Sequence, residues 1–140
     1  MPSCLKCRPL GYRRGTGTKV SDLHCAAEKP SGGFSLDDSS DTADVDLTAM
    51  TLQCLEPYAT EEEISAIIDR GVEFLADAQA EDGGYEAYGD KSSESVSQVI
   101  LALSTYGIDC NKDARFQKKE KGLYDNLMEY YKKMEAFPIY

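Results

Sequence analysis

The chain has 140 residues, of which 41% are hydrophobic and 9% aromatic, and it carries a formal net charge of −10 at pH 7. This length and composition are typical of one soluble globular domain with a core of its own. The acidic charge argues against nucleic acids and anionic lipid surfaces as partners, since both would repel it. No apolar run approaches the roughly 20 residues that a membrane-spanning helix needs.

Residues 1–30 differ from the rest of the chain, because they are rich in Gly, Arg, Lys and Pro and follow neither a helical nor a strand period. We expect an irregular, disordered leader over this segment, a repeat domain over residues 31–134 and a short tail over residues 135–140. The leader is basic, yet its apolar residues are scattered singly, so it does not resemble a secretory signal peptide. The sequence leaves the cellular location open.

The first two helices are predicted over about residues 44–56 and 60–80. In the first segment, apolar residues recur at helical spacing and predict a buried face made of Leu47, Met50, Cys54 and Leu55. The second segment opens with Thr60, and Glu63 follows three residues later, which is the spacing of a capping box. An apolar stripe along the second segment predicts that one of its faces is buried.

Two further helices are predicted over about residues 93–106 and 122–134. The earlier of them is followed by Gly107, which favours the left-handed conformation that ends many helices. A glycine-rich turn separates it from the helix before it, and no segment alternates convincingly like a strand. The sequence therefore predicts an all-α fold.

Two parts of the chain repeat each other. Gly32-Gly33-Phe34 recurs 51 residues later as Gly83-Gly84-Tyr85, and residues 48–55 align with residues 96–103, which lie 48 residues further on. A period near 50 residues with two helices in each unit is typical of stacked helical hairpins, because one hairpin cannot bury both of its faces. The chain holds about two such units. A third would begin near residue 123, and no Gly-Gly-aromatic turn follows it.

One motif joins the second predicted helix to the glycine-rich turn. Its members are Arg70, Gly71, Phe74, Leu75, Gln79, Gly83, Gly84 and Tyr85. The pattern resembles the QW motif of the squalene cyclase and prenyltransferase repeat family, with Tyr85 where the motif has Trp. In that family the Gln side chain ties a helix end to the adjoining turn, and the aromatic residue packs on it. The resemblance implies a partial (α/α)6 toroid, in a truncated member of a bacterial surface or secreted protein.

The segment 44–49 resembles the Asp-x-Asp-Asp-Thr-Ala motif of class II terpene cyclases, whose middle Asp protonates an alkene or epoxide. That resemblance assigns the acid to Asp46 and its partner to Asp44. Leu47 stands where the cyclases have a third Asp, and the chain has no Trp with which to hold carbocations. The other interpretation is that both carboxylates cap a helix N-terminus and interact with its dipole.

The second repeat offers a comparison for these carboxylates, because Ser92 and Glu94 occupy the equivalent positions. Two different residue types there favour a repeated cap over a unique acid. By the resemblance, Ser93, Glu94 and Gln98 face the inner mouth of the toroid, where this fold places ligands. The only histidine, His24, lies in the leader, so we expect no metal and no cofactor.

Two functions follow from the resemblance. The first is a non-catalytic toroid module that binds a small ligand or a protein partner. The alternative is a fragment of a class II terpene cyclase or prenyltransferase acting on isoprenoids. An open stack of hairpins also exposes apolar end faces, so we expect self-association through them.

Overall fold

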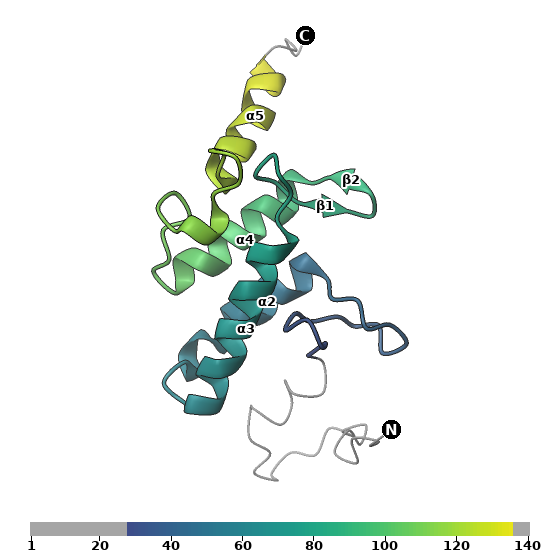
Figure 1. The fold of residues 1–140 in the computed structure, drawn as a ribbon, viewed down its shortest axis with the longest axis vertical. Helices are drawn as coiled ribbons and strands as arrows, with labels where there is room; N and C mark the ends of the chain where they lie inside the picture. The colour runs from purple at the N-terminus through teal and green to yellow at the C-terminus, as the bar shows by residue number, and fades with distance from the viewer. Residues whose placement is uncertain (1–27, 136–140) are drawn as a thin grey trace.

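The computed structural model describes residues 28–135 of the chain (Figure 1). The predicted leader and tail lie almost wholly outside this range. In chain order the elements are α2 (Val45–Leu55), η1 (Glu56–Tyr58), α3 (Glu62–Ala78), β1 (Glu86–Ala87), β2 (Asp90–Lys91), α4 (Ser93–Thr105), η2 (Ala114–Phe116) and α5 (Leu123–Glu135). The four predicted helices are confirmed within a few residues at each end.

The start of α3 differs from the predicted capping box. Its N-cap is Glu61, and no side chain caps it. The chain leaves α2 through the 3-10 turn η1 and forms a further turn in which the backbone N–H of Glu61 donates to the carbonyl of Tyr58. Thr60 therefore lies inside a turn, one residue too early to cap the helix.

A small β-hairpin also departs from the all-α prediction. β1 and β2 pair antiparallel, with Glu86 opposite Lys91 and Ala87 opposite Asp90 (Figure 1). The two-residue connection has positive φ at both Tyr88 (54°) and Gly89 (87°), as a type I′ turn requires. Strands of two residues are too short for an alternating pattern, so periodicity could not reveal them.

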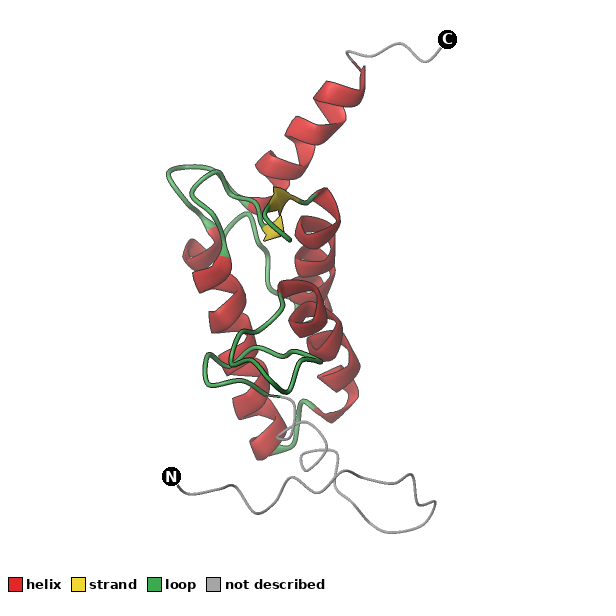
Figure 2. Cartoon of the chain, turned by 90° about the vertical axis from the view of Figure 1, so that its right-hand side faces the viewer, coloured by secondary structure: helices red, strands yellow, loops and turns green. Residues whose placement is uncertain are grey.

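The most extensive packing in the domain is between α2 and α4, while α3 packs on α2 and α5 packs on α4. One end of α5 projects beyond the other helices (Figures 1 and 2). The core side chains come from all four helices and the connections between them. The largest that are fully buried include Leu52, Leu55, Ile64, Ile67, Leu75, Tyr85, Val96, Val99, Leu103, Phe116 and Leu123.

The predicted buried face of α2 is only partly correct. Leu55 is buried, but Met50 and Cys54 are exposed, and the buried positions of this helix are Thr48, Ala49, Leu52 and Leu55. Helical spacing identifies which residues share a face, yet the side that is covered depends on where α3 and α4 pack.

The internal repeat is visible in the backbone of the two glycine turns. The N–H of Lys29 donates to the carbonyl of Gly33 over 2.8 Å, and 51 residues later the N–H of Ala80 donates to the carbonyl of Gly84 over 2.9 Å. The aromatic residue that follows is buried in both turns. The same conformation has therefore formed twice from two related sequences.

The ends of α4 and α2 are joined by Tyr106, whose hydroxyl donates to the carbonyl of Leu52. Tyr106 is followed by Gly107, which has a φ of 69°. The N–H of Gly107 donates to the carbonyl of Ser104, and the N–H of Ile108 donates to that of Leu103, each over 3.0 Å. These two bonds form a Schellman motif, which confirms Gly107 as the predicted helix terminator.

We predict that the stability of the domain falls as Tyr106 titrates. Burial, with the nearby carboxylate of Glu56 as a second cause, raises the pKa of Tyr106 from 10.0 to about 12. The hydroxyl therefore loses its proton more easily in the unfolded chain. Its stabilising contribution is complete below pH 10 and is lost as the pH rises toward 12. Urea unfolding of the wild type at pH 9 to 12 should show this loss.

Tyr106→Phe is the matched variant for that measurement. It removes the titrating hydroxyl and the bond to Leu52 while keeping the ring, so the variant should be less stable at pH 9 and should lose less stability between pH 10 and 12. Burial also raises the pKa of Tyr85, so some alkaline loss remains in both chains. Identical slopes in the two chains would contradict the assignment to Tyr106.

Candidate functional site

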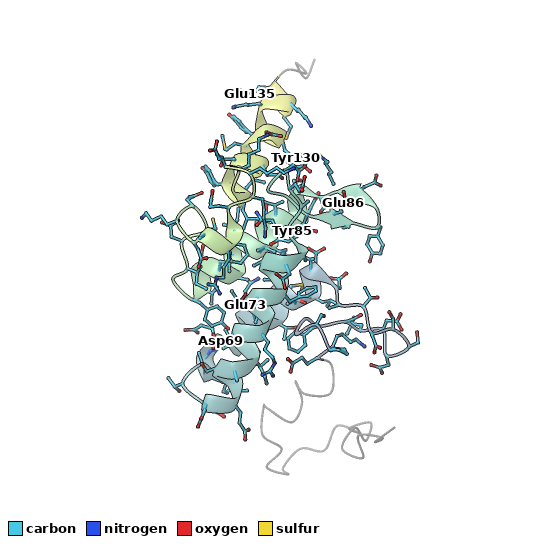
Figure 3. All side chains as sticks on the ribbon, viewed as in Figure 1. Asp69, Glu73, Tyr85, Glu86, Tyr130 and Glu135 are labelled. Atoms are coloured by element: carbon cyan, nitrogen blue, oxygen red, sulfur yellow. The ribbon has the colours of Figure 1, made fainter. Side chains whose placement is uncertain are left out.

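An open groove of about 630 Å³ lies between the first turns of α4 and the projecting part of α5. One wall comes from α4 and the other from α5. The lining residues are Ser93, Glu94, Ser97, Gln98, Leu127, Met128, Tyr130, Tyr131 and Met134. Figure 3 labels Tyr130 of the α5 wall.

The α4 wall of the groove is polar. Ser92 caps α4 by accepting a hydrogen bond from the N–H of Ser95 over 3.1 Å. Glu94 accepts from the Ser93 hydroxyl over 3.1 Å, and the pKa of Glu94 is lowered, first by a backbone N–H at the helix start and then by that hydroxyl. The groove therefore has an ionised carboxylate at its edge at neutral pH.

The α5 wall of the groove is mostly apolar. Leu127 and Met128 are half-buried, whereas Tyr131 is 54% exposed and Met134 is 71% exposed. The apolar side chains of α5 recur at helical spacing and therefore share one face of the helix. In the structure, the C-terminal half of that face borders the groove, because the projecting half of α5 has little of the domain packed against it.

The sequence prediction had placed Ser93, Glu94 and Gln98 at a ligand-facing position, and the structure brings these three side chains together in the groove. Gln98 also accepts a hydrogen bond from the Gln53 side chain over 3.3 Å, which links the groove to α2. The contribution of α5 was not predicted. Its residues are about 30 positions away in sequence, and only the packing of α5 on α4 brings them near.

Asp44 and Asp46 lie at the start of α2, and neither lines the groove. Asp44 is the N-cap of α2 and accepts a hydrogen bond from the N–H of Leu47 over 2.8 Å. Ser92 caps α4 in the same way, so the two repeats share this feature. One carboxylate oxygen of Asp46 is buried and has no hydrogen-bond partner among the described residues.

The motif from Arg70 to Tyr85 forms a junction between α3 and the glycine turn. Gln79, at the C-cap of α3, donates to the carbonyls of Gly83 and Phe116, each over 3.0 Å. Tyr85 donates to the carbonyl of Leu75 over 2.6 Å. The side chain of Gln79 thus joins the helix end to the turn and to η2, and the aromatic residue closes the turn onto the helix.

The glycines of this junction are positions of close approach. A Cβ on Gly83, whose φ is 84°, would lie 2.6 Å from the carbonyl oxygen of Gly122. On Gly84 it would lie 2.6 Å from the side chain of Asn126. A larger residue at position 83 would have to move the backbone before α5, and one at position 84 would have to displace the buried side chain of Asn126.

The remaining motif residues hold α3 against the first repeat. Arg70 forms two hydrogen bonds with Glu28, of 2.6 and 2.9 Å. A Cβ on Gly71 would lie 2.7 Å from Leu52, so this glycine sets the close approach of α3 to α2. The ring of Phe74 packs in the same way against Gly33. All eight motif residues therefore have structural contacts, and none lines the groove.

We predict that Gln79→Ala destabilises the domain by about 2 kcal/mol, since two buried carbonyls would lose their donor. For a domain of this size the melting temperature should fall by roughly 10 °C, measurable by circular dichroism. Gln98→Ala is the control, because its one side-chain hydrogen bond is to another, partly exposed, glutamine. Equal melting temperatures for the two variants would contradict the role of Gln79.

Residues 28–135 contain no helix long and apolar enough to cross a membrane. The same residues contain no cluster of three His, Cys, Asp or Glu side chains that could hold a metal ion. His24 lies outside this range. Comparison with family models, with curated proteins and with solved structures gives no match to the chain.

Proposed function

We propose that the chain is a two-repeat segment of an α/α toroid that acts as a non-catalytic binding module, with the groove between α4 and α5 as its site. The repeated glycine turn, the repeated helix N-cap and the repeated helical hairpin support the toroid architecture. The extensive α2–α4 packing and the outer positions of α3 and α5 are what neighbouring units of such a stack require.

The observation that carries the binding proposal is the composition of the groove. An exposed apolar wall beside polar groups is typical of a site that receives an apolar group and orients it with a few hydrogen bonds. Glu94 and Gln98 supply acceptors on one side, and Tyr131 and Met134 supply apolar surface on the other. A ligand or partner segment with an apolar group and an adjacent donor fits both walls. The negative charge of the chain disfavours nucleic acid.

The module is non-catalytic in our proposal because Asp44 has a structural role. It caps α2, and Ser92 performs the same task in the second repeat, so a structural need accounts for both residues. We propose further that the parent protein is a surface or secreted protein.

The alternative, a fragment of a class II terpene cyclase or prenyltransferase, has one observation in its favour. Asp46, to which the resemblance assigns the acid, has a carboxylate oxygen that is buried and lacks a hydrogen-bond partner among the described residues. Leu47 in place of the third Asp and the absence of Trp weigh against it.

The binding proposal is tested with the neutral apolar dye N-phenyl-1-naphthylamine, whose fluorescence rises on transfer from water to an apolar site. We expect the wild-type chain to enhance it and Met134→Glu to reduce the bound fraction several-fold, since a charge at the apolar wall opposes entry. Tyr124→Glu is the matched control, because Tyr124 is an exposed aromatic residue on the same helix that does not line the groove. Equal loss in both variants, or none in Met134→Glu, would overturn the site assignment.

Asp46→Asn separates the proposed function from the alternative. A binding module should keep its helicity and its dye affinity in this variant, and neither chain should convert squalene or geranylgeranyl diphosphate to a cyclic product. Product analysis by gas chromatography and mass spectrometry makes the comparison. A cyclic product from the wild type that Asp46→Asn no longer forms would establish the enzyme instead.

A further inference from the structure

The internal repeat allows each end of the domain to be compared with the contact between its two units. Asp44 and Ser92 are both N-caps, and the helices that they begin start at residues 45 and 93. Positions 48 residues apart in α2 and α4 are therefore equivalent. Each surface of one helix can be matched with the corresponding surface of the other.

Two hydrogen bonds cross the α2–α4 contact, and we use the residues that form them as markers of the two surfaces that meet there. On the α4 side they come from Gln98 and Tyr106, and on the α2 side from Gln53 and the carbonyl of Leu52. All four residues are buried or half-buried in this contact.

The α4 marker Gln98 corresponds to Met50 of α2, which is 50% exposed. Tyr106, the C-cap of α4, lies 48 positions after Tyr58, which belongs to the turn η1 at the end of α2 and is 40% exposed. The exposed Cys54 is equivalent to Ala102, which is fully buried. We call the surface formed by Met50, Cys54 and Tyr58 the front face.

The equivalents of the α2 markers lie on α4. Leu52 corresponds to Ile100, and Gln53 corresponds to Leu101, which is 55% exposed. We call the surface formed by Ile100 and Leu101 the rear face. The chain thus has both halves of the α2–α4 contact a second time, one on α2 and one on α4, and they are apolar at Met50 and Leu101.

We propose that a second copy of this chain packs its front face on the rear face of the first copy and so continues the α2–α4 contact from one chain to the next. Leu101 of one copy then lies against Met50 of the other, as Gln53 lies against Gln98 within one chain. Tyr58, like Tyr106, has a hydroxyl group, and this hydroxyl donates a hydrogen bond to the carbonyl of Ile100 in the neighbouring copy.

The front and rear faces differ, so the contact is head-to-tail and each dimer still has one free face of each kind. The repeat specifies a further unit of the same kind as the occupant of each face, and a second copy of this chain supplies that unit. Both matching surfaces are present in one sequence, and the contact between them already exists inside the chain.

The test is sedimentation velocity on the full chain, with a reducing agent present because Cys54 lies on the front face. The wild type should show a weight-average mass that rises with concentration above the 15.4 kDa of one chain. Met50→Glu has a defective front face and Leu101→Glu a defective rear face, and both residues are exposed, so the variants should fold. Each alone should stay at the mass of one chain.

An equimolar mixture of Met50→Glu and Leu101→Glu should form a complex of two chains and nothing larger. The intact rear face of the first variant can receive the intact front face of the second. Tyr58→Phe should weaken wild-type association roughly fivefold through loss of one hydrogen bond. Tyr88→Glu, at the exposed tip of the β-hairpin, should leave the association of the chains unchanged.

Three outcomes would overturn the proposal. The first is a wild type that remains at the mass of one chain at every concentration. The second is a Met50→Glu chain that associates with itself, which would indicate a symmetric contact through the rear face alone. The third is a mixture of the two variants that stays monomeric while the wild type associates, which would show that the two faces are not partners.

Discussion

Gln79 lies where three parts of the backbone meet, at the end of α3, in the glycine turn and beside η2. Its side chain donates hydrogen bonds to the carbonyl of Gly83 in the turn and to the carbonyl of Phe116, which lies 37 positions further along the chain. With the bond from Tyr85 to Leu75, this fixes the direction in which the chain leaves α3. That direction places α4 on α2 and the start of α5 on the glycine turn, so the groove and both end faces depend on this one junction.

Comparing the two repeats distinguishes a structural role from a catalytic role for the carboxylates at the start of α2. A carboxylate at a helix start is compatible with capping and with acid catalysis, and the sequence around Asp44 leaves both open. In the structure Ser92 caps the equivalent helix with a hydroxyl, so the position requires a hydrogen-bond acceptor and not an acid. Asp46 lacks such an explanation for its buried oxygen, which is why the alternative function depends on that residue.

The front face of α2 shows the limit of reading burial from periodicity. Met50 and Cys54 share the helical spacing of a buried face, and both are exposed. Of their equivalents on α4, Gln98 accepts a hydrogen bond from Gln53 of α2, and Ala102 is fully buried. The pattern predicts a surface suited to packing, but within the described residues no second helix covers it. The proposed head-to-tail contact would account for the pattern.

The sequence by itself determined the four helices, the period near 50 residues and the junction motif, because spacing, glycine turns and caps act over a few neighbouring positions. It did not reveal the hairpin at Tyr88, whose strands are too short to show a pattern. It also missed the burial of Phe116, whose environment is created by segments far away in the chain. Only the tertiary structure decided that α5 forms the second wall of the groove and which faces of α2 and α4 stay uncovered. Those features depend on how whole helices pack on one another, and no local pattern in the sequence encodes that arrangement.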